Sequence, residues 1–144
     1  LACDLRIAAE GASFVLAFGR IGLVPDSGLT WFLPRLVGPA RAAELIFTGD
    51  PLSAAEAERL GLVNRVVPGD ALETEVSALA GRFASAAPRA LALAKRALNR
   101  SLEVGLAEAL DYEASLQGIA GRTRDHAEGL AAFLEKRPPR FTGQ

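Results

Sequence analysis

The sequence is poor in several residue types that carry chemistry. Its 144 residues include no methionine, one cysteine, one histidine and one tryptophan. The single cysteine, Cys3, cannot form an internal disulfide, which fits a reducing compartment, and we expect a cytoplasmic location. One cysteine and one histidine do not make a zinc-binding set, so we expect no metal site.

Long apolar runs and an excess of one charge are also missing. No run approaches the roughly 20 apolar residues that span a bilayer, so we expect no membrane segment. The 16 Lys and Arg side chains nearly balance 17 Asp and Glu side chains, and the charges are scattered. No basic face therefore favours nucleic acid, and no polybasic run favours a membrane surface.

The missing methionine has a second consequence. The chain starts inside a strand-like run, Leu1-Ala2-Cys3-Asp4, without an initiating residue. This pattern predicts a piece of a longer protein. Hydrophobic residues nevertheless make up 50% of the chain, which is enough for one domain with a core of its own.

Hydrophobic patterning predicts a mixed first part and a helical second part. Short apolar runs bounded by glycine and proline predict strands or extended segments, namely Leu5–Ala9, Phe14–Phe18 and Leu62–Val67. Helical spacing and end signals predict helices over 40–48, 53–61, 70–85, 88–99, 106–119 and 123–137, with a shorter one near 27–37 that Pro34 interrupts. We therefore expect a boundary between residues 1–69 and residues 70–144.

The helical part carries apolar faces. Leu72, Val76, Leu79, Ala80 and Phe83 recur at helical spacing, which predicts one buried face. The later helices are rich in alanine, and such helices pack closely against neighbours, including neighbouring subunits. We therefore expect an oligomer.

Three local patterns predict helix ends. Ser53 and Glu56 fit a capping box, in which each side chain satisfies a backbone N–H of the other residue. Asp125 and Glu128 lie in the first turn of the last helix, where carboxylates complement the helix dipole. His126 lies in the same turn, and we interpret it as solvated or locally hydrogen-bonded rather than as a ligand.

One carboxylate stands among residues that are normally buried. In the stretch Ile21–Arg35, IGLVPDSGLTWFLPR, proline fixes a backbone angle and lacks an N–H, so the tetrapeptide Pro25–Gly28 predicts a tight turn around Asp26. A carboxyl group in an apolar surrounding has a raised pKa, because desolvation disfavours its charged form, and such a group both takes and gives protons. Asp26 is therefore a candidate acid/base catalyst.

Asp26 has an alternative interpretation. An aspartate just before a helix often caps it, and a helix is expected to begin near Ser27 or Thr30. Spacing alone leaves both interpretations open. A proton carrier, unlike a cap, should face a cavity rather than bulk water.

The motifs resemble a known family. The run over residues 1–68, LACDLRIAAEGASFVLAFGRIGLVPDSGLTWFLPRLVGPARAAELIFTGDPLSAAEAERLGLVNRVVP, and the ending EGLAAFLEKRPPRF are similar to the enoyl-CoA hydratase/isomerase (crotonase) superfamily. The resemblance covers essentially the whole chain. Within the superfamily, the pattern around GLVPDSG and the FLEKR ending most resemble the 1,2-epoxyphenylacetyl-CoA isomerase group.

The resemblance implies a fold and a chemistry. The implied fold class is α/β: residues 1–69 are the C-terminal part of a spiral of ββα turns, and residues 70–144 are a helical trimerisation region. It implies a homotrimer or hexamer and an acyl-CoA substrate, whose coenzyme A belongs to the substrate and is no separate cofactor. In the implied reaction, two backbone N–H groups, both from segments before Leu1, stabilise a thioester enolate while a carboxylate moves the proton.

The resemblance also implies roles for individual residues. Asp26 stands where isomerases of the superfamily place their catalytic aspartate. The implied substrate-binding residues are Phe18, Pro25, Gly28, Trp31, Phe133 and Lys136. Phe18 stands where hydratases carry one of two glutamates, which disfavours hydration by the two-glutamate route. Leu29 departs from the family, which usually has a second glycine there.

Several of these roles have structural alternatives. Phe18 and Trp31 are pocket wall or simply core. The resemblance implies that Phe133 lines the acyl pocket and that Lys136 reaches the coenzyme A, both in the site of a neighbouring subunit. The alternative for Lys136 is a solvated lysine at a helix end. Three functions remain: an isomerase of a double bond or a ring epoxide, in phenylacetate or fatty-acid catabolism; a hydratase using Asp26 with an upstream glutamate; and a non-catalytic, truncated assembly module.

Overall fold

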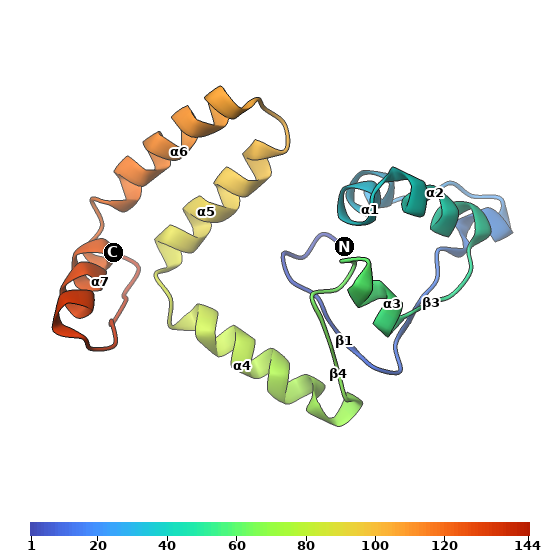
Figure 1. Cartoon of the computed structure of the whole chain (residues 1–144), viewed down its shortest axis with the longest axis horizontal. Helices are drawn as coiled ribbons and strands as arrows, with labels where there is room; N and C mark the ends of the chain where they lie inside the picture. The colour runs from blue at the N-terminus through green and yellow to red at the C-terminus, as the bar shows by residue number, and fades with distance from the viewer. The chain divides into compact units, whose positions relative to one another are not determined.

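The computed structural model describes all of residues 1–144 and consists of two compact units, Leu1–Ser77 and Ala78–Gln144 (Figure 1). The boundary between them falls within helix α4, which spans Leu72–Ala84. None of the helices has both the length and the apolar character required to cross a bilayer.

The first unit contains all the strands and the shorter helices. Its elements are β1 (Ile7–Ala9), β2 (Ser13–Phe14), the 3-10 helix η1 (Ala17–Ile21), α1 (Leu29–Val37), α2 (Pro39–Thr48), β3 (Leu52–Ser53), α3 (Ala54–Arg59), β4 (Arg65–Val67), the 3-10 helix η2 (Gly69–Ala71) and the start of α4. Strand β1 pairs with β4 in parallel, and β2 pairs with β3 antiparallel. The result is two separate two-stranded sheets.

Residues 14–18 were predicted as a strand or an extended segment, and only Phe14 of them lies in a strand. Strand β2 ends at Phe14, and the chain turns into η1 at Ala17. The partner strand explains the early end, because β3 offers only two residues between Pro51, which has no N–H, and the start of α3. Gly22, with φ of 73°, then ends η1 in a left-handed conformation.

Helices α1 and α2 follow their sequence signals closely. Gly38, with φ of 80°, separates them, and Pro39 occupies the first turn of α2. The predicted interruption at Pro34 is wrong, because α1 continues through this residue to Val37. A proline within the helix leaves only the carbonyl of Thr30, four residues earlier, without its helical donor.

Only one of the two hydrogen bonds of the predicted capping box of α3 forms. The Ser53 hydroxyl accepts the N–H of Glu56 at 3.2 Å, as predicted. The Glu56 carboxylate does not return to Ser53, and instead pairs with Arg59 at 3.0 Å and Arg41 at 3.7 Å. The Glu56 carboxylate therefore pairs with the two arginines rather than with the backbone N–H of Ser53.

The core of the first unit lies among α1, α2, α3 and the strands. Its buried members are Ala8, Leu33, Ala42, Leu45, Leu52, Ala54, Ala57, Leu62 and Val63. Leu33 is the largest side chain that is fully buried, with 1% of its surface exposed. Small residues dominate the rest, which lets α1 and α2 lie side by side (Figure 1).

The second unit is helical throughout. It contains the end of α4, then α5 (Pro88–Ser101), α6 (Leu106–Ala120) and α7 (Arg124–Glu135), with a tail over 136–144. Helices α5 and α6 run antiparallel beside each other (Figure 1). Thr123 caps α7 as predicted, because its hydroxyl accepts the N–H of His126 at 3.1 Å.

The buried face predicted for α4 is wrong for this chain. No residue of α4 or α5 is buried, and Val76 and Phe83 remain 44% exposed. An apolar helix face is buried only when another element covers it. These faces therefore stay uncovered in this chain.

Candidate functional site

The turn predicted around Asp26 is present and has an unusual geometry. The Asp26 carbonyl accepts the N–H of Leu29 at 2.9 Å. The two residues between them, Ser27 and Gly28, have φ angles of 50° and 81°. Left-handed conformations at both central positions define a type I′ turn.

Gly28 meets two demands of this turn. A Cβ atom at this position would lie 3.1 Å from the Phe32 ring, and the left-handed φ is already unfavourable for any side chain. The Gly28 carbonyl accepts the N–H groups of Trp31 and Phe32 at 2.9 and 3.0 Å, which begins α1. Ser27 has a Cβ atom, which disfavours the left-handed backbone conformation, so this residue stores about 1–2 kcal/mol of strain. Strained residues of this kind concentrate at functional sites.

The capping interpretation of Asp26 is wrong. Gly28 is the N-cap of α1, and no side chain caps this helix. The Asp26 carboxylate has no hydrogen-bond or ion-pair partner, whereas its carbonyl closes the turn. The acid is therefore left chemically available.

The surroundings of Asp26 are apolar but uncovered. Asp26 itself is exposed, and Ile21, Leu23 and Val24 before it are 72%, 60% and 75% exposed. The expectation that Asp26 faces a cavity is therefore wrong for this chain alone. An acid/base role requires that another part of the protein cover this apolar wall and exclude water.

Two aromatic residues flank the turn. Phe18 lies half-buried in η1, and its carbonyl accepts the N–H of Leu23 at 3.0 Å. Trp31 is 41% exposed, and the Arg35 guanidinium lies 4.0 Å from its ring centre. Neither aromatic belongs to the buried core or to the side chains packed against it. The alternative that they are core residues is not supported, and the pocket-wall role stays a prediction.

Two neighbours of Asp26 contribute differently. Pro25 is half-buried directly before the acid. Leu29, which departs from the family's usual glycine, packs against the core of the first unit. The Leu29 side chain therefore anchors the start of α1 to the core of the first unit.

Phe133 and Lys136 lie in the second unit. Phe133 is 79% exposed on α7, and Lys136 ends that helix with a left-handed φ of 53°. Asp26 and its neighbours belong to the first unit. The proposed contribution of Phe133 and Lys136 to a site around a substrate therefore stays a prediction.

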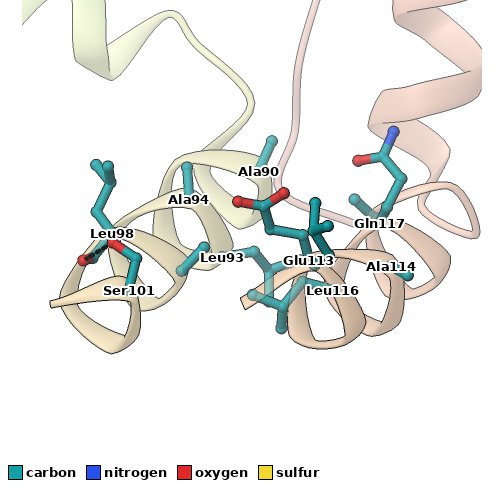
Figure 2. A pocket seen from close by; sticks show the side chains of 12 residues that line it. Ala90, Leu93, Ala94, Leu98, Ser101, Glu113, Ala114, Leu116 and Gln117 are labelled. Carbon is teal, nitrogen blue, oxygen red and sulfur yellow. Dashed lines mark hydrogen bonds between the residues drawn. The ribbon is translucent and has the colours of Figure 1, made fainter. Parts of the chain in front are cut away.

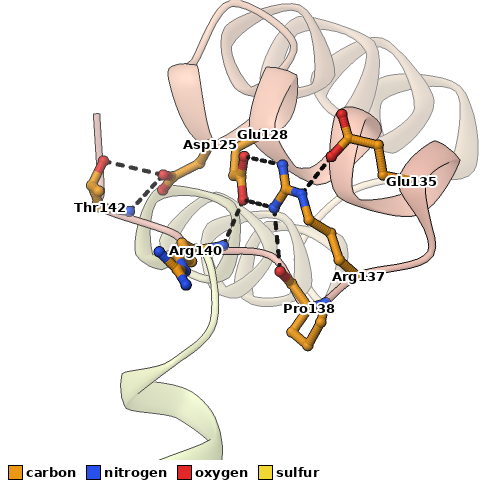
Figure 3. Close-up of polar contacts among 7 residues, drawn as sticks. All are labelled: Asp125, Glu128, Glu135, Arg137, Pro138, Arg140 and Thr142. Carbon is orange, nitrogen blue, oxygen red and sulfur yellow. Dashed lines mark hydrogen bonds and ion pairs between the residues drawn. The ribbon is translucent and has the colours of Figure 1, made fainter.

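Acidic side chains of α7 form a polar cluster with residues of the tail, and no sequence pattern indicated this cluster (Figure 3). Glu128 receives two hydrogen bonds from the Arg137 guanidinium, at 2.7 and 3.0 Å, and one from the backbone N–H of Arg140 at 2.8 Å. These bonds lower the pKa of Glu128 to about 2 and raise the pKa of Arg137.

Asp125 completes this cluster from the buried side. Its carboxylate accepts the N–H of Thr142 at 2.7 Å (Figure 3). It also accepts the N–H of Gly143 at 2.9 Å, and 3% of the residue is exposed. Asp125 lies in the first turn of α7 as predicted, whereas the first-turn placement predicted for Glu128 is wrong, because that residue lies further along the helix. Both acids also hold the tail against the helix, which is a structural role.

An apolar groove lies between α5 and α6 in the second unit. Its volume is about 680 Å³, and its lining includes Leu98 and Leu110. Alanines from both helices, among them Ala94 and Ala114, line it together with Leu93 (Figure 2). Ser101, Glu113 and Gln117 are its polar members. This lining holds no cluster of reacting groups that would indicate a catalytic site.

Comparisons with known proteins decide the family. A family model described as enoyl-CoA hydratase/isomerase matches residues 1–144. The chain belongs to the enoyl-CoA hydratase/isomerase family. It is 46% identical to a probable enoyl-CoA hydratase of Rhodobacter capsulatus, over all of this chain and 56% of that protein. It is 43% identical to the 1,2-epoxyphenylacetyl-CoA isomerase of Escherichia coli K12, over 98% of this chain and 54% of that protein.

The fold agrees with this membership. A crystal structure of an enoyl-CoA hydratase from Bacillus anthracis matches with a TM-score of 0.96 and 44% identity, over 99% of this chain and 55% of that one. The chain thus has a mixed α/β crotonase-like fold with few short strands and a largely helical C-terminal region, as predicted. It spans about half the length of the relatives it matches.

The narrower resemblance is not distinguished by these matches. Proteins named as hydratases and a protein named as an isomerase match this chain with similar identity. Membership of the family is therefore secure, and the reaction must be argued from the residues.

Proposed function

We propose that this family member is an acyl-CoA isomerase in which Asp26 moves a proton between two carbons of the acyl group. The observation that carries the proposal is the unpartnered carboxylate on the strained type I′ turn. Neither a cap nor an ion pair occupies this acid, so the turn has no structural use for its charge. A catalytic use accounts for both the strain and the missing partner.

The proposed reaction needs one acid/base group. The Asp26 carboxylate takes a proton from one carbon of the acyl group, and the electrons move into the thioester carbonyl as an enolate. The protonated acid then returns the proton at another carbon, which shifts the double bond. For a ring epoxide, the same acid moves the proton as the ring rearranges. Backbone N–H groups outside this chain hold the enolate oxygen.

The flanking residues give this acid its proposed surroundings. Phe18, Pro25 and Trp31 form the wall against the acyl group, and Gly28 lets the backbone approach closely. Phe133 and Lys136, presented by a neighbouring subunit, complete the acyl pocket and contact the coenzyme A phosphates. Because Asp26 is exposed in this chain, the proposal requires the rest of the protein to cover it.

Assembly and location follow the same proposal. The apolar faces of α4 and the groove between α5 and α6 support contact between copies of the chain, as in a homotrimer or hexamer. We place the enzyme in the cytoplasm, where its exposed cysteine stays reduced.

Hydration is the second candidate. Several of the matching relatives are named as hydratases, including the crotonyl-CoA hydratase of Syntrophomonas wolfei. Phe18 disfavours the two-glutamate route, because it stands where the resemblance places one of the two glutamates and an apolar ring cannot activate water. A hydratase would have to combine Asp26 with a glutamate from outside this chain.

One experiment separates these functions. The full-length protein is assayed on a Δ3-enoyl-CoA, on a ring-epoxide acyl-CoA and on crotonyl-CoA, with Asp26→Asn beside wild type. Loss of a general acid/base costs about 10²–10⁴-fold, so we expect isomerisation to fall by at least about 100-fold. Asp70→Asn is the matched control, because Asp70 is also exposed and unpartnered.

The outcomes discriminate clearly. Hydration of crotonyl-CoA as the main activity would favour the second candidate. Unchanged turnover in Asp26→Asn would contradict both catalytic proposals and leave the truncated assembly module.

A further inference from the structure

The indole of Trp31 is in contact with an arginine of its own helix. Trp31 and Arg35 lie about one turn apart on α1, and the Arg35 guanidinium lies over the Trp31 ring, 4.0 Å from its centre. The same guanidinium donates a hydrogen bond to the Trp31 carbonyl at 3.0 Å. The electron-rich face of an indole attracts a cation, and a planar guanidinium also stacks on it. The two contacts together fix Arg35 over the ring.

Arg35 differs from other arginines of the chain in what its charge contacts. Carboxylates pair with Arg20, Arg41, Arg59, Arg65, Arg100 and Arg137. The contacts of the Arg35 guanidinium are instead with the ring and the carbonyl of Trp31. The charge of Arg35 therefore acts on a single aromatic residue.

A second aromatic ring connects Trp31 to the turn that carries Asp26. The ring centres of Trp31 and Phe32 lie 4.9 Å apart at an interplanar angle of 81°, which is an edge-to-face arrangement. The Phe32 ring also lies against Gly28, where an added Cβ atom would come within 3.1 Å of it. The indole therefore contacts both Arg35 and Phe32, and Phe32 fixes its place relative to the turn.

We infer that Arg35 is a positioning residue, which fixes the Trp31 indole in the orientation in which its free surface contacts the acyl group. This role rests on the proposed function, in which Trp31 is a wall of the acyl site. Trp31 is 41% exposed, so its contacts with Arg35 and Phe32 leave part of its surface available. A mobile side chain loses rotamer freedom when a ligand binds to it, and a side chain that is already fixed loses less.

A purely structural role for Arg35 is the alternative. Its hydrogen bond to the Trp31 carbonyl lies beside Pro34, which supplies no N–H to α1, so the bond would reinforce the helix. A bond to the carbonyl does not by itself require the guanidinium to lie over the indole, which favours the positioning role. The two roles differ in their consequences, because only the positioning role acts on acyl binding through the Trp31 ring.

Binding of unreactive ligands tests this role. The ligands are octanoyl-CoA and phenylacetyl-CoA, which lack the alkene or epoxide that the proposed reaction moves, and free coenzyme A. Their dissociation constants are measured by calorimetry with the full-length protein. One exposed cation–π contact corresponds to about a two- to fivefold change in an equilibrium constant. We expect Arg35→Met to weaken the tighter-bound acyl-CoA by about this factor and to leave binding of free coenzyme A unchanged.

Two further variants complete the comparison. Arg35→Lys keeps a cation near the ring, and we expect it to recover part of the affinity that Arg35→Met loses. Arg59→Met is the matched control, because Arg59 is an exposed helical arginine of the same unit that pairs with Glu56. We expect this variant to bind all three ligands like wild type.

A double-mutant cycle shows whether Arg35 acts through Trp31. Trp31→Leu removes the ring, and we expect it to weaken the acyl-CoA at least as much as Arg35→Met does. In the Trp31→Leu background we expect Arg35→Met to have no further effect, because no ring is left to position. A structural role would instead give the same loss in both backgrounds.

Four results would overturn the positioning role. The first is equal weakening of acyl-CoA and free coenzyme A by Arg35→Met. The second is the same loss from Arg35→Met with and without the Trp31 ring. The third is wild-type binding by Arg35→Met when Trp31→Leu weakens the acyl-CoA, and the fourth is wild-type binding by Trp31→Leu itself. None of these measurements follows a reaction, so a full-length protein that binds acyl-CoA without isomerising it would reject the proposed reaction and not the role of Arg35.

Discussion

The two units are stabilised by different kinds of interaction. The first buries a continuous apolar cluster between α1, α2, α3 and the strands. The second buries only Leu116, Asp125 and Ala132, and one of these is an acid that holds the tail. The first unit therefore depends on a core that it contains, whereas the second depends on helix pairing and polar tail contacts.

Core truncation gives the largest expected contrast between the units. Leu33→Ala removes the largest fully buried side chain of the first unit and should destabilise it by about 2–5 kcal/mol. Leu98→Ala is the control in the second unit, because Leu98 is 69% exposed, and should change stability by less than about 0.5 kcal/mol. The measurement is urea unfolding, with Trp31 reporting the first unit and Tyr112 the second. Equal effects would contradict the contrast.

The type I′ turn gives the next largest effect. Gly28→Ala places a Cβ atom 3.1 Å from the Phe32 ring and forces alanine into a left-handed backbone, so we expect about 1–2 kcal/mol of destabilisation. Gly11→Ala is the matched control, since a Cβ there meets no atom within 4 Å. Thermal unfolding followed by Trp31 fluorescence compares the two. A neutral Gly28→Ala would mean that the turn relaxes freely.

Acid sensitivity should reveal the smallest difference, and only in the second unit. The pKa of Glu128 is about 2 in the folded chain, below the ordinary value of 4.5 for a glutamate, because the hydrogen bonds from Arg137 and Arg140 favour the ionised form. A depressed pKa means that the ionised acid contributes stability above pH 4.5, and that this contribution is lost between pH 4.5 and 2. We expect the backbone amides of residues 138–144 to lose protection from hydrogen exchange as the pH falls from 4.5 to 2. Glu128→Gln should remove the dependence, whereas Glu108→Gln should leave it intact.

Local sequence signals predicted much of the fold because they act within a few residues. Gly38 and Pro39 separate two helices, Ser53 and Thr123 cap two others, and all four act as the patterns indicate. The signals failed where distant residues decide. The strand after Phe14 was overestimated because its length depends on a partner about 40 residues away.

The candidate site was predictable to the same extent. The sequence indicated a turn at Asp26, and the turn is there, yet its left-handed Ser27 and its exposure were not foreseen. Exposure depends on what covers a surface, which no local pattern encodes. The role of Asp125 was missed for a related reason, because its partners lie 17 and 18 residues further along the chain.

The exposed thiol of Cys3 has a practical consequence. It is the only cysteine in a chain with one tryptophan, and both belong to the first unit. A maleimide dye attached there would accept excitation energy from the indole of Trp31 without any engineered substitution. Opening or closing of this unit is thus open to energy-transfer measurements in the natural sequence.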